Sequence, residues 1–174
     1  MDMDEALRPV TDEAMRSRVN RRLRDHWLTL APESRLPEWS SFDPAPVKAI
    51  LPHLIVVDVG DGGGRFRFRV IGTFVTQLAG RDSTGRWLDR DLYGDRLEYM
   101  TWHYRRCAES AEPLAILGTI HFVDKDWVTA EHLFLPFGDG GRVDKVLCGL
   151  DMLLGDTRRE GKDRDVEMIL DWRK

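Results

Sequence analysis

The sequence predicts an α+β fold: a five-stranded antiparallel sheet with helices on one face, preceded by an N-terminal amphipathic helix. Two observations predict this fold. Five apolar segments of strand length occur, two before and three after a single long helical segment. Short turns rich in glycine and aspartate separate the strands within each group, so neighbouring strands are expected to pair antiparallel. The strands are predicted at residues 54–59, 66–71, 114–123, 128–137 and 143–154.

The turns between these strands have the composition of hairpin connections. Glycine and aspartate at residues 60–64, 124–127 and 139–142 adopt the positive-φ and type I conformations that tight turns need. The glycine-rich run at 60–64 precedes a strand, and no lysine follows it at the spacing of a phosphate-binding loop. It is therefore interpreted as a hairpin turn and not as a nucleotide site.

One long helix, predicted at residues 95–111, connects the two groups of strands. Leu97, Met100, Tyr104 and Cys107 recur at helical spacing and form its apolar side, which we expect to cover the sheet. Two shorter helical segments are predicted at residues 43–51 and 73–79.

An amphipathic helix is predicted close to the N-terminus, where Thr11 offers a capping hydroxyl and Pro32 ends the helix. Its apolar residues recur every four positions and form one seam. The seam must be buried, either on the chain's own sheet or on a second copy. We predict a homodimer that uses this seam. The seam consists of Met15, Val19, Leu23 and Trp27.

Three regions follow from this pattern. Residues 1–35 are interpreted as the amphipathic dimerisation element, residues 36–154 as the sheet domain, and residues 155–174 as a charged C-terminal tail. The end of the tail, at residues 166–172, is apolar enough for two alternatives, a flexible arm or a segment that docks late on the domain.

Composition limits the class of protein. The chain has 174 residues, of which 42% are hydrophobic, enough to bury a core. No apolar run has the length of a membrane span, and the acidic N-terminus is unlike a secretory signal, so a cytoplasmic protein is expected. A net charge of -4 argues against a general nucleic-acid binder. Cys107 and Cys148 lack a C-x-x-C partner and are interpreted as buried small apolar residues.

The predicted hairpins assign side chains to the two faces of the sheet. Pairing Asp124 with Trp127 places Glu131 between Ile120 and Leu150, on the face toward the long helix. A slip of one residue would exchange the two faces. The same register predicts Leu133, Leu135 and Phe137 on that face, and His132 and Phe134 on the other.

A cup between the long helix and the sheet is the candidate ligand site. A carboxylate among apolar side chains must be partnered or protonated, so Glu131 is either a polar anchor for a small ligand or part of an internal ion pair. Arg69 either binds an anion or forms a structural ion pair. The candidate ligand-binding residues are Glu131, His103, Tyr104 and Arg69.

Metal binding is not predicted. His121 and His132 are expected on one face of adjacent strands, but no third ligand accompanies them, and zinc requires three or four. No nucleophile motif such as Gly-x-Ser-x-Gly is present, and no catalytic residue is assigned.

Several short motifs, taken in order, resemble the stand-alone PAS-like family of alphaproteobacteria, formerly catalogued as a domain of unknown function (PAS_5 type). The resemblance covers roughly residues 27–154. It implies a PAS fold and a bacterial cytosolic regulatory role without associated catalysis, and it names no ligand. The motifs are Leu36-Pro37, Phe42-Asp43-Pro44, Leu51-Pro52, residues 68–73, Gly80-Arg81-Asp82 with Thr84-Gly85, and residues 131–137.

The resemblance raises the question of known PAS cofactors. Haem-binding members use a histidine on a helix over the cup, which His103 could supply, whereas flavin photosensors need a cysteine context that Cys107 does not match. The cofactor is therefore unknown, and none is evident.

Three functions are compatible with these observations. The leading one is a non-enzymatic sensory or regulatory module that contacts a signalling protein partner and holds a small ligand in its cup. The second is a small enzyme with Glu131 as general base and Tyr104 or His103 as acid. The third is an adaptor for polyanions or acidic proteins that uses the arginines between Arg16 and Arg24.

Overall fold

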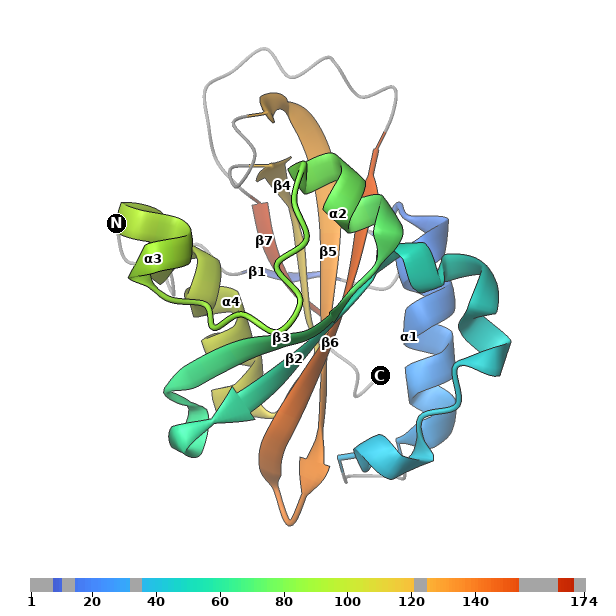
Figure 1. Ribbon diagram of the computed structural model, residues 1–174. Coiled ribbons are helices and arrows are strands. Elements are labelled where there is room, and N and C mark those ends of the chain that lie inside the picture. Colours follow the sequence, from blue (N-terminus) through green and yellow to red (C-terminus); the bar gives the residue numbers. More distant parts are fainter. Residues whose placement is uncertain (1–7, 11–14, 32–35, 121–124, 154–165, 171–174) are drawn as a thin grey trace.

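The computed structural model describes residues 8–10, 15–31, 36–120, 125–153 and 166–170. Its centre is one seven-stranded sheet with the strand order β1-β7-β4-β5-β6-β2-β3. Helix α1 lies on one side of this sheet, and α3 and α4 lie on the other (Figure 1). The α+β fold class predicted from the sequence is confirmed.

The five predicted strands all form, and each pairs antiparallel with its neighbour in the sheet. They are β2 (Leu54–Gly60), β3 (Arg65–Ile71), β4 (Leu114–Ile120), β5 (Lys125–Asp139) and β6 (Arg142–Met152). Two short strands extend the sheet beyond β4. β7 (Val166–Leu170) pairs antiparallel with β4, and β1 (Arg8–Val10) pairs parallel with β7. The end of the charged tail thus docks on the sheet edge, the second of the two alternatives.

Four α-helices and four short 3₁₀ segments connect the strands within the described residues. The helices are α1 (Arg18–Leu30), α2 (Thr73–Ala79), α3 (Arg90–Tyr93) and α4 (Leu97–Ser110). The 3₁₀ segments are η3 (Trp39–Ser41), η4 (Ala45–His53), η5 (Asp61–Gly63) and η6 (Gly94–Arg96). In the part of the chain that the structure describes, no helix has both the length and the apolar character needed to cross a bilayer.

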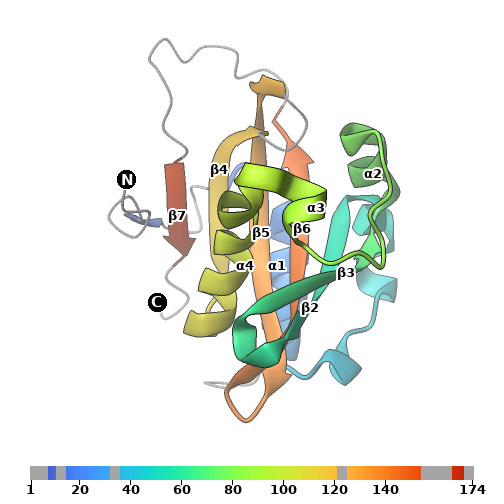
Figure 2. The ribbon, with the colours of Figure 1, turned by 60° about the vertical axis from the view of Figure 1, so that its left-hand side comes forward.

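Two apolar cores lie on opposite faces of the sheet. The first is formed with α4 and includes Phe66, Phe68 and Phe134, while the second is formed with α1 and η4. Figure 2 shows α4 in front of β4 and β5, with α1 behind the sheet. Cys107 and Cys148 are both buried in the α4 core, as predicted.

Helix α1 covers its own sheet. Ser17 caps the helix, accepting a hydrogen bond from the Asn20 amide at 3.0 Å, so the regular helix begins later than the sequence suggested. Residues 11–14, where the start was predicted, lie outside the described part. The seam residues Met15, Leu23 and Trp27 are buried against the sheet, and Val19 is partly buried there. These four residues are therefore not exposed, and a dimer contact through them would require α1 to leave the sheet.

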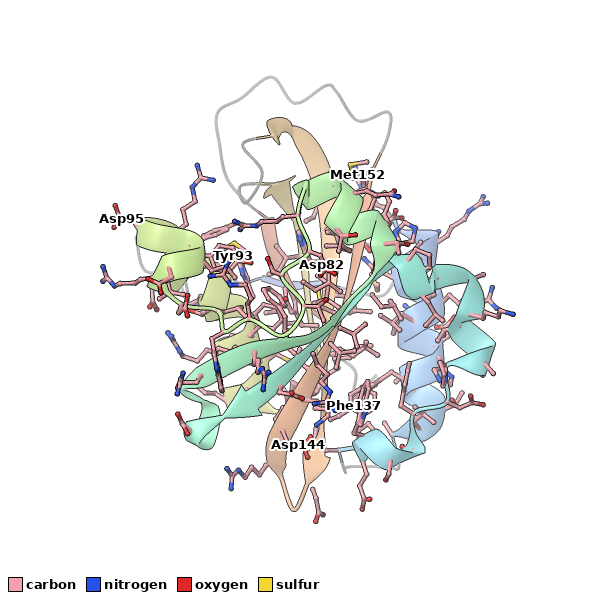
Figure 3. All side chains as sticks on the ribbon, in the orientation of Figure 1. Asp82, Tyr93, Asp95, Phe137, Asp144 and Met152 are labelled. Carbon is pink, nitrogen blue, oxygen red and sulfur yellow. The ribbon has the colours of Figure 1, made fainter. Side chains whose placement is uncertain are left out.

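The predicted orientation of β5 is wrong. Glu131 lies opposite Leu117 on β4 and Asp151 on β6, instead of Ile120 and Leu150. The register shifts at Thr119/Ile120 and again at Phe137/Gly138, and a shift of odd length reverses which side chains face each way. The α1 core therefore contains Leu133, Leu135 and Phe137, and Phe134 belongs to the α4 core. Phe137 is labelled in Figure 3 on the α1 side of the sheet.

Candidate functional site

A cavity of about 80 Å³ opens on the α4 side of the sheet, and we call it the cup. Strands β2 to β6 form its floor, and α2, α3, α4 and the loop after α2 form its walls. Its apolar lining consists of Ile55, Phe68, Ile71, Val75, Ala79, Met100, Ile116, Phe134 and Leu150. Its polar lining consists of Arg81, Ser83, Tyr93, Tyr99, His103, Tyr104 and His132.

Phe134 organises the aromatic floor of the cup. The ring of His103 stacks on it at 5.6 Å between centroids, with an interplanar angle of 11°. His132, two residues away on the same strand and so on the same face, lies parallel to it at 6.1 Å. The Tyr104 ring meets Phe134 edge-on at 5.2 Å. These contacts fix both imidazoles at the surface of an apolar cavity.

Two phenols of the cup, those of Tyr93 and Tyr104, remain protonated in the neutral pH range. Burial raises the pKa of Tyr93 to about 12, although the nearby Arg81 guanidinium opposes this shift. Burial also raises the pKa of Tyr104 well above its ordinary value, and the neighbouring Cys148 thiol adds to the effect. Each phenol is therefore a neutral group that can donate a hydrogen bond.

The loop after α2 brings Arg81 and Ser83 to the cup. Gly80, at φ 69°, ends the helix in the left-handed conformation that favours glycine. The Asp82 carboxylate then accepts a hydrogen bond from the Thr84 amide at 2.9 Å, and bonds to Thr84 lower the pKa of Asp82. Figure 3 labels Asp82 in this loop and Tyr93 on α3.

Backbone hydrogen bonds attach the same loop to strand β3. The Gly85 amide donates to the Phe68 carbonyl at 2.7 Å, and the Phe68 amide donates to the Arg86 carbonyl at 2.9 Å. The Arg67 side chain also donates to the Gly85 carbonyl at 2.9 Å. The loop is thus held as an additional edge of the sheet, and the buried Ser83 has a defined position at the cavity.

Two of the four predicted ligand residues line the cup. His103 and Tyr104 lie there, as α4 was expected to place them. Arg69 instead lies exposed on β3, and its guanidinium is 4.0 Å from the Asp58 carboxylate, so it forms the structural ion pair named as its alternative. Glu131 lies on the opposite face of the sheet, because the register of β5 differs from the predicted one by an odd number of residues.

Glu131 is fully buried beneath the start of α1. Its Oε2 accepts hydrogen bonds from the backbone amides of Arg16 at 2.7 Å and Ser17 at 3.1 Å. The side-chain nitrogen of Asn20, Nδ2, donates to Glu131 Oε1 at 3.2 Å and to the backbone carbonyl of Glu131 at 3.0 Å. The Ser17 hydroxyl extends the group by donating to Asp151 at 2.7 Å. We call this group of five residues the Glu131 anchor.

The Glu131 anchor decides between the interpretations of this carboxylate. Donated hydrogen bonds stabilise the buried carboxylate, so it is partnered internally and does not hold a ligand in the cup. Tyr104 and His103 face the other side of the sheet. The catalytic arrangement with Glu131 as base and either of them as acid is therefore wrong.

Sequence reasoning missed part of the cup. The connection between α2 and α4 is polar, and its path depends on long-range hydrogen bonds to β3, so its cup residues Arg81, Ser83 and Tyr93 were not predicted. His132 was predicted on the wrong face of the sheet. The Gly80-Arg81-Asp82 motif could have indicated that Arg81 lies beside the cup. Gly80 ends α2, so Arg81 is the first residue after the helix and its position is fixed by the helix end.

The histidines and the volume of the cup bear on the metal and cofactor hypotheses. His121 lies outside the described residues, and His132 faces the cup. Among the described residues, no three His, Cys, Asp or Glu side chains are grouped closely enough to hold a metal ion. A cavity of about 150 Å³ holds benzene, so a cup of about 80 Å³ is too small for a haem or flavin ring in this conformation.

Between Arg16 and Arg24, all the arginines except Arg24 form an exposed face opposite the buried seam of α1; the Arg24 side chain is only 12% exposed. Arg16, Arg18 and Arg21 are exposed. Arg22 donates to the Pro46 carbonyl at 2.8 Å, and Arg24 pairs with Asp25 at 2.7 Å. Part of this basic face is thus used within the chain.

Comparison with known proteins agrees with this architecture. A family model described as PAS domain matches residues 15–150, which includes α1 and the central strands up to Leu150 on β6. No curated protein matches the chain. The fold, the cup and the extent of this match together show that the chain belongs to the PAS domain family.

Proposed function

We propose that this protein is a non-enzymatic sensory or regulatory module. Its cup takes a small molecule, and α1 transmits the occupied state to a signalling protein partner. One observation supports this above the others: strand β5 lines the cup with one set of side chains and holds α1 with the alternate set.

The alternation on β5 gives a physical route between the two sites. His132 and Phe134 face the cup, while Glu131 and Leu133 face α1. A ligand that displaces the Phe134 ring would move the strand backbone by which Glu131 holds the first turn of α1. Because the anchor is a set of directional hydrogen bonds, a small shift changes its strength more than it would change an apolar contact.

The outer surface of α1 is the proposed partner contact. Arg18 and Arg21 are exposed there, and Leu28 is 42% exposed near the end of the helix. Exposed cations on the same helix face as an exposed leucine favour an acidic protein surface, either on another signalling protein or on a second copy of this acidic chain. This contact replaces the seam first predicted to form a homodimer.

Native mass spectrometry of the full chain, purified from its natural source, tests the proposal. We expect the wild-type protein to retain a small molecule. Met100→Trp, which fills the cup, should release the ligand, while Val70→Trp on the exposed surface of β3 should retain it. Equal retention by the two variants would place the ligand elsewhere, and a wild-type chain that retains nothing would contradict sensing through the cup.

A further inference from the structure

The polar side chains of the cup share one chemical property: each can donate a hydrogen bond. Arginine donates only, while the serine, tyrosine and histidine side chains can donate as well as accept. Among the described residues that line the cup, none is Asp or Glu. Because the lining has donors and a cation but no acid, it suits a group that is negatively charged and accepts hydrogen bonds.

Arg81 supplies the permanent positive charge. Its guanidinium carbon lies 5.7 Å from the centre of the Tyr93 ring, so the cation rests near an aromatic face at the wall of the cup. Within the described residues, no carboxylate forms an ion pair with Arg81. The adjacent Asp82 carboxylate is turned toward Thr84 instead.

Two hydroxyl groups, those of Ser83 and Tyr93, line the same cup as this charge. Ser83 is buried two residues further along the same loop, and the Tyr93 ring lies beside the Arg81 guanidinium. The sheet contributes apolar side chains to the same cup, among them Ile116, Phe134 and Leu150. The ligand should therefore have one anionic end and one apolar end.

We infer that the cup binds a short-chain organic carboxylate, with its carboxylate at Arg81 and Ser83 and its apolar tail against Phe134. This inference rests on the proposed function of the cup and adds the chemical class of its ligand. The cup has about half the volume of a cavity of about 150 Å³ that holds benzene, so it encloses about three carbon atoms, the branched end of the tail, while the carboxylate lies at the exposed Arg81.

Three probes with the same branched carbon skeleton and different end groups test the inference: 3-methylbutanoate, 3-methylbutanamide and 3-methylbutylamine. Binding is measured on the full wild-type chain by the NMR shifts of the methionine methyl groups, because Met100 lines the cup. We expect the carboxylate to bind at least about tenfold more tightly than the amide, since a charged hydrogen bond replaces a neutral one. The amine should bind more weakly than both.

A matched pair of variants tests the role of Arg81. Arg81→Gln should weaken binding of 3-methylbutanoate about tenfold and leave 3-methylbutanamide unchanged. Arg86→Gln removes the same charge from the same loop, from an exposed residue that does not line the cup, and should leave both affinities unchanged. A melting curve of each variant shows that it is folded.

The outcomes separate this inference from the proposed function. If Met100→Trp abolishes binding of all three probes but the wild type binds amide and acid equally, the cup takes ligands and the carboxylate class is wrong. Tighter binding of the amine, or equal losses in the two arginine variants, would also overturn it. If none of the probes binds, the carboxylate inference fails, and native mass spectrometry still decides whether the cup holds another molecule.

Discussion

At the scale of single residues, Glu131 shows how one buried charge can hold two elements together. It lies 114 residues from Ser17 along the chain, yet it accepts hydrogen bonds from two backbone amides there and from Asn20. A buried carboxylate without partners would be strongly destabilising. Here the partners are the amides just before α1 and the side chain on its first turn, so the start of the helix and the charge satisfy each other.

Glu131→Gln tests this interpretation. The amide nitrogen of glutamine would replace an acceptor with a donor, facing Asn20 or the backbone amides. We expect the free energy of unfolding, measured with urea, to fall by about 1–3 kcal/mol. Glu109→Gln, on the exposed side of α4, should change it by less than about 0.5 kcal/mol. Equal effects of the two substitutions would mean that the anchor does not stabilise the fold.

At the scale of elements, the contact of α1 with β6 depends on a glycine. A Cβ on Gly149 would overlap the Asn20 side-chain oxygen and lie 2.9 Å from Leu23 Cδ2. The glycine thus lets α1 approach the sheet closely enough for Asn20 to reach Glu131. At the other end of the helix, the Trp27 indole donates to the Pro136 carbonyl at 3.0 Å.

Gly149→Ala should therefore loosen α1 from the sheet. We expect a loss of about 1–3 kcal/mol in unfolding free energy, as for overpacking of a filled core. Trypsin should also cleave faster among the arginines of α1, because the docked helix protects them. Gly64→Ala is a suitable control, since its added Cβ would meet only the Asp61 carbonyl at 3.5 Å. Unchanged cleavage in Gly149→Ala would show that helix docking tolerates the methyl group.

At the scale of the whole molecule, one sheet separates two cores, and the α4 core contains both thiols. Burial raises the pKa of Cys107 and of Cys148. In the folded chain both thiols keep their protons above the ordinary thiol pKa, whereas the unfolded chain releases them. The unfolded state then binds fewer protons, so stability is complete below the ordinary thiol pKa and falls as pH rises above it.

Unfolding free energies at about pH 7 and about pH 9.5 measure this dependence. Each thiol should contribute a loss of about 1.4 kcal/mol per pH unit above its unfolded pKa, or about 2–3 kcal/mol for both over this range. The double variant Cys107→Ala, Cys148→Ala should start from lower stability, because it leaves cavities, but decline less with pH. The same slope in both proteins would assign the alkaline loss to other groups.

The existence and type of the main elements were determined by the sequence itself. Alternating apolar residues, the turns of glycine and aspartate at residues 60–64 and 139–142, and the helical spacing of Leu97, Met100, Tyr104 and Cys107 are local signals, and each correctly predicted an element. The turn predicted at residues 124–127 is not among them, because β5 already begins at Lys125 and residue 124 lies outside the described part. The burial of both cysteines, and the place of His103 and Tyr104 beside the cup, were predicted from local patterns of this kind.

Only the tertiary structure decided which face of β5 forms the cup. Two register shifts exchange the faces to which the side chains of β5 point. Neither shift has a local sequence signature strong enough to locate it. The change moved Glu131 from the cup to the α1 anchor and moved His132 and Phe134 into the cup. The burial of the α1 seam was predictable from the sequence. The surface that buries it was not, because it is fixed by contacts between residues more than a hundred positions apart. Local patterns specify which elements form, whereas register and long-range packing specify which side chains meet.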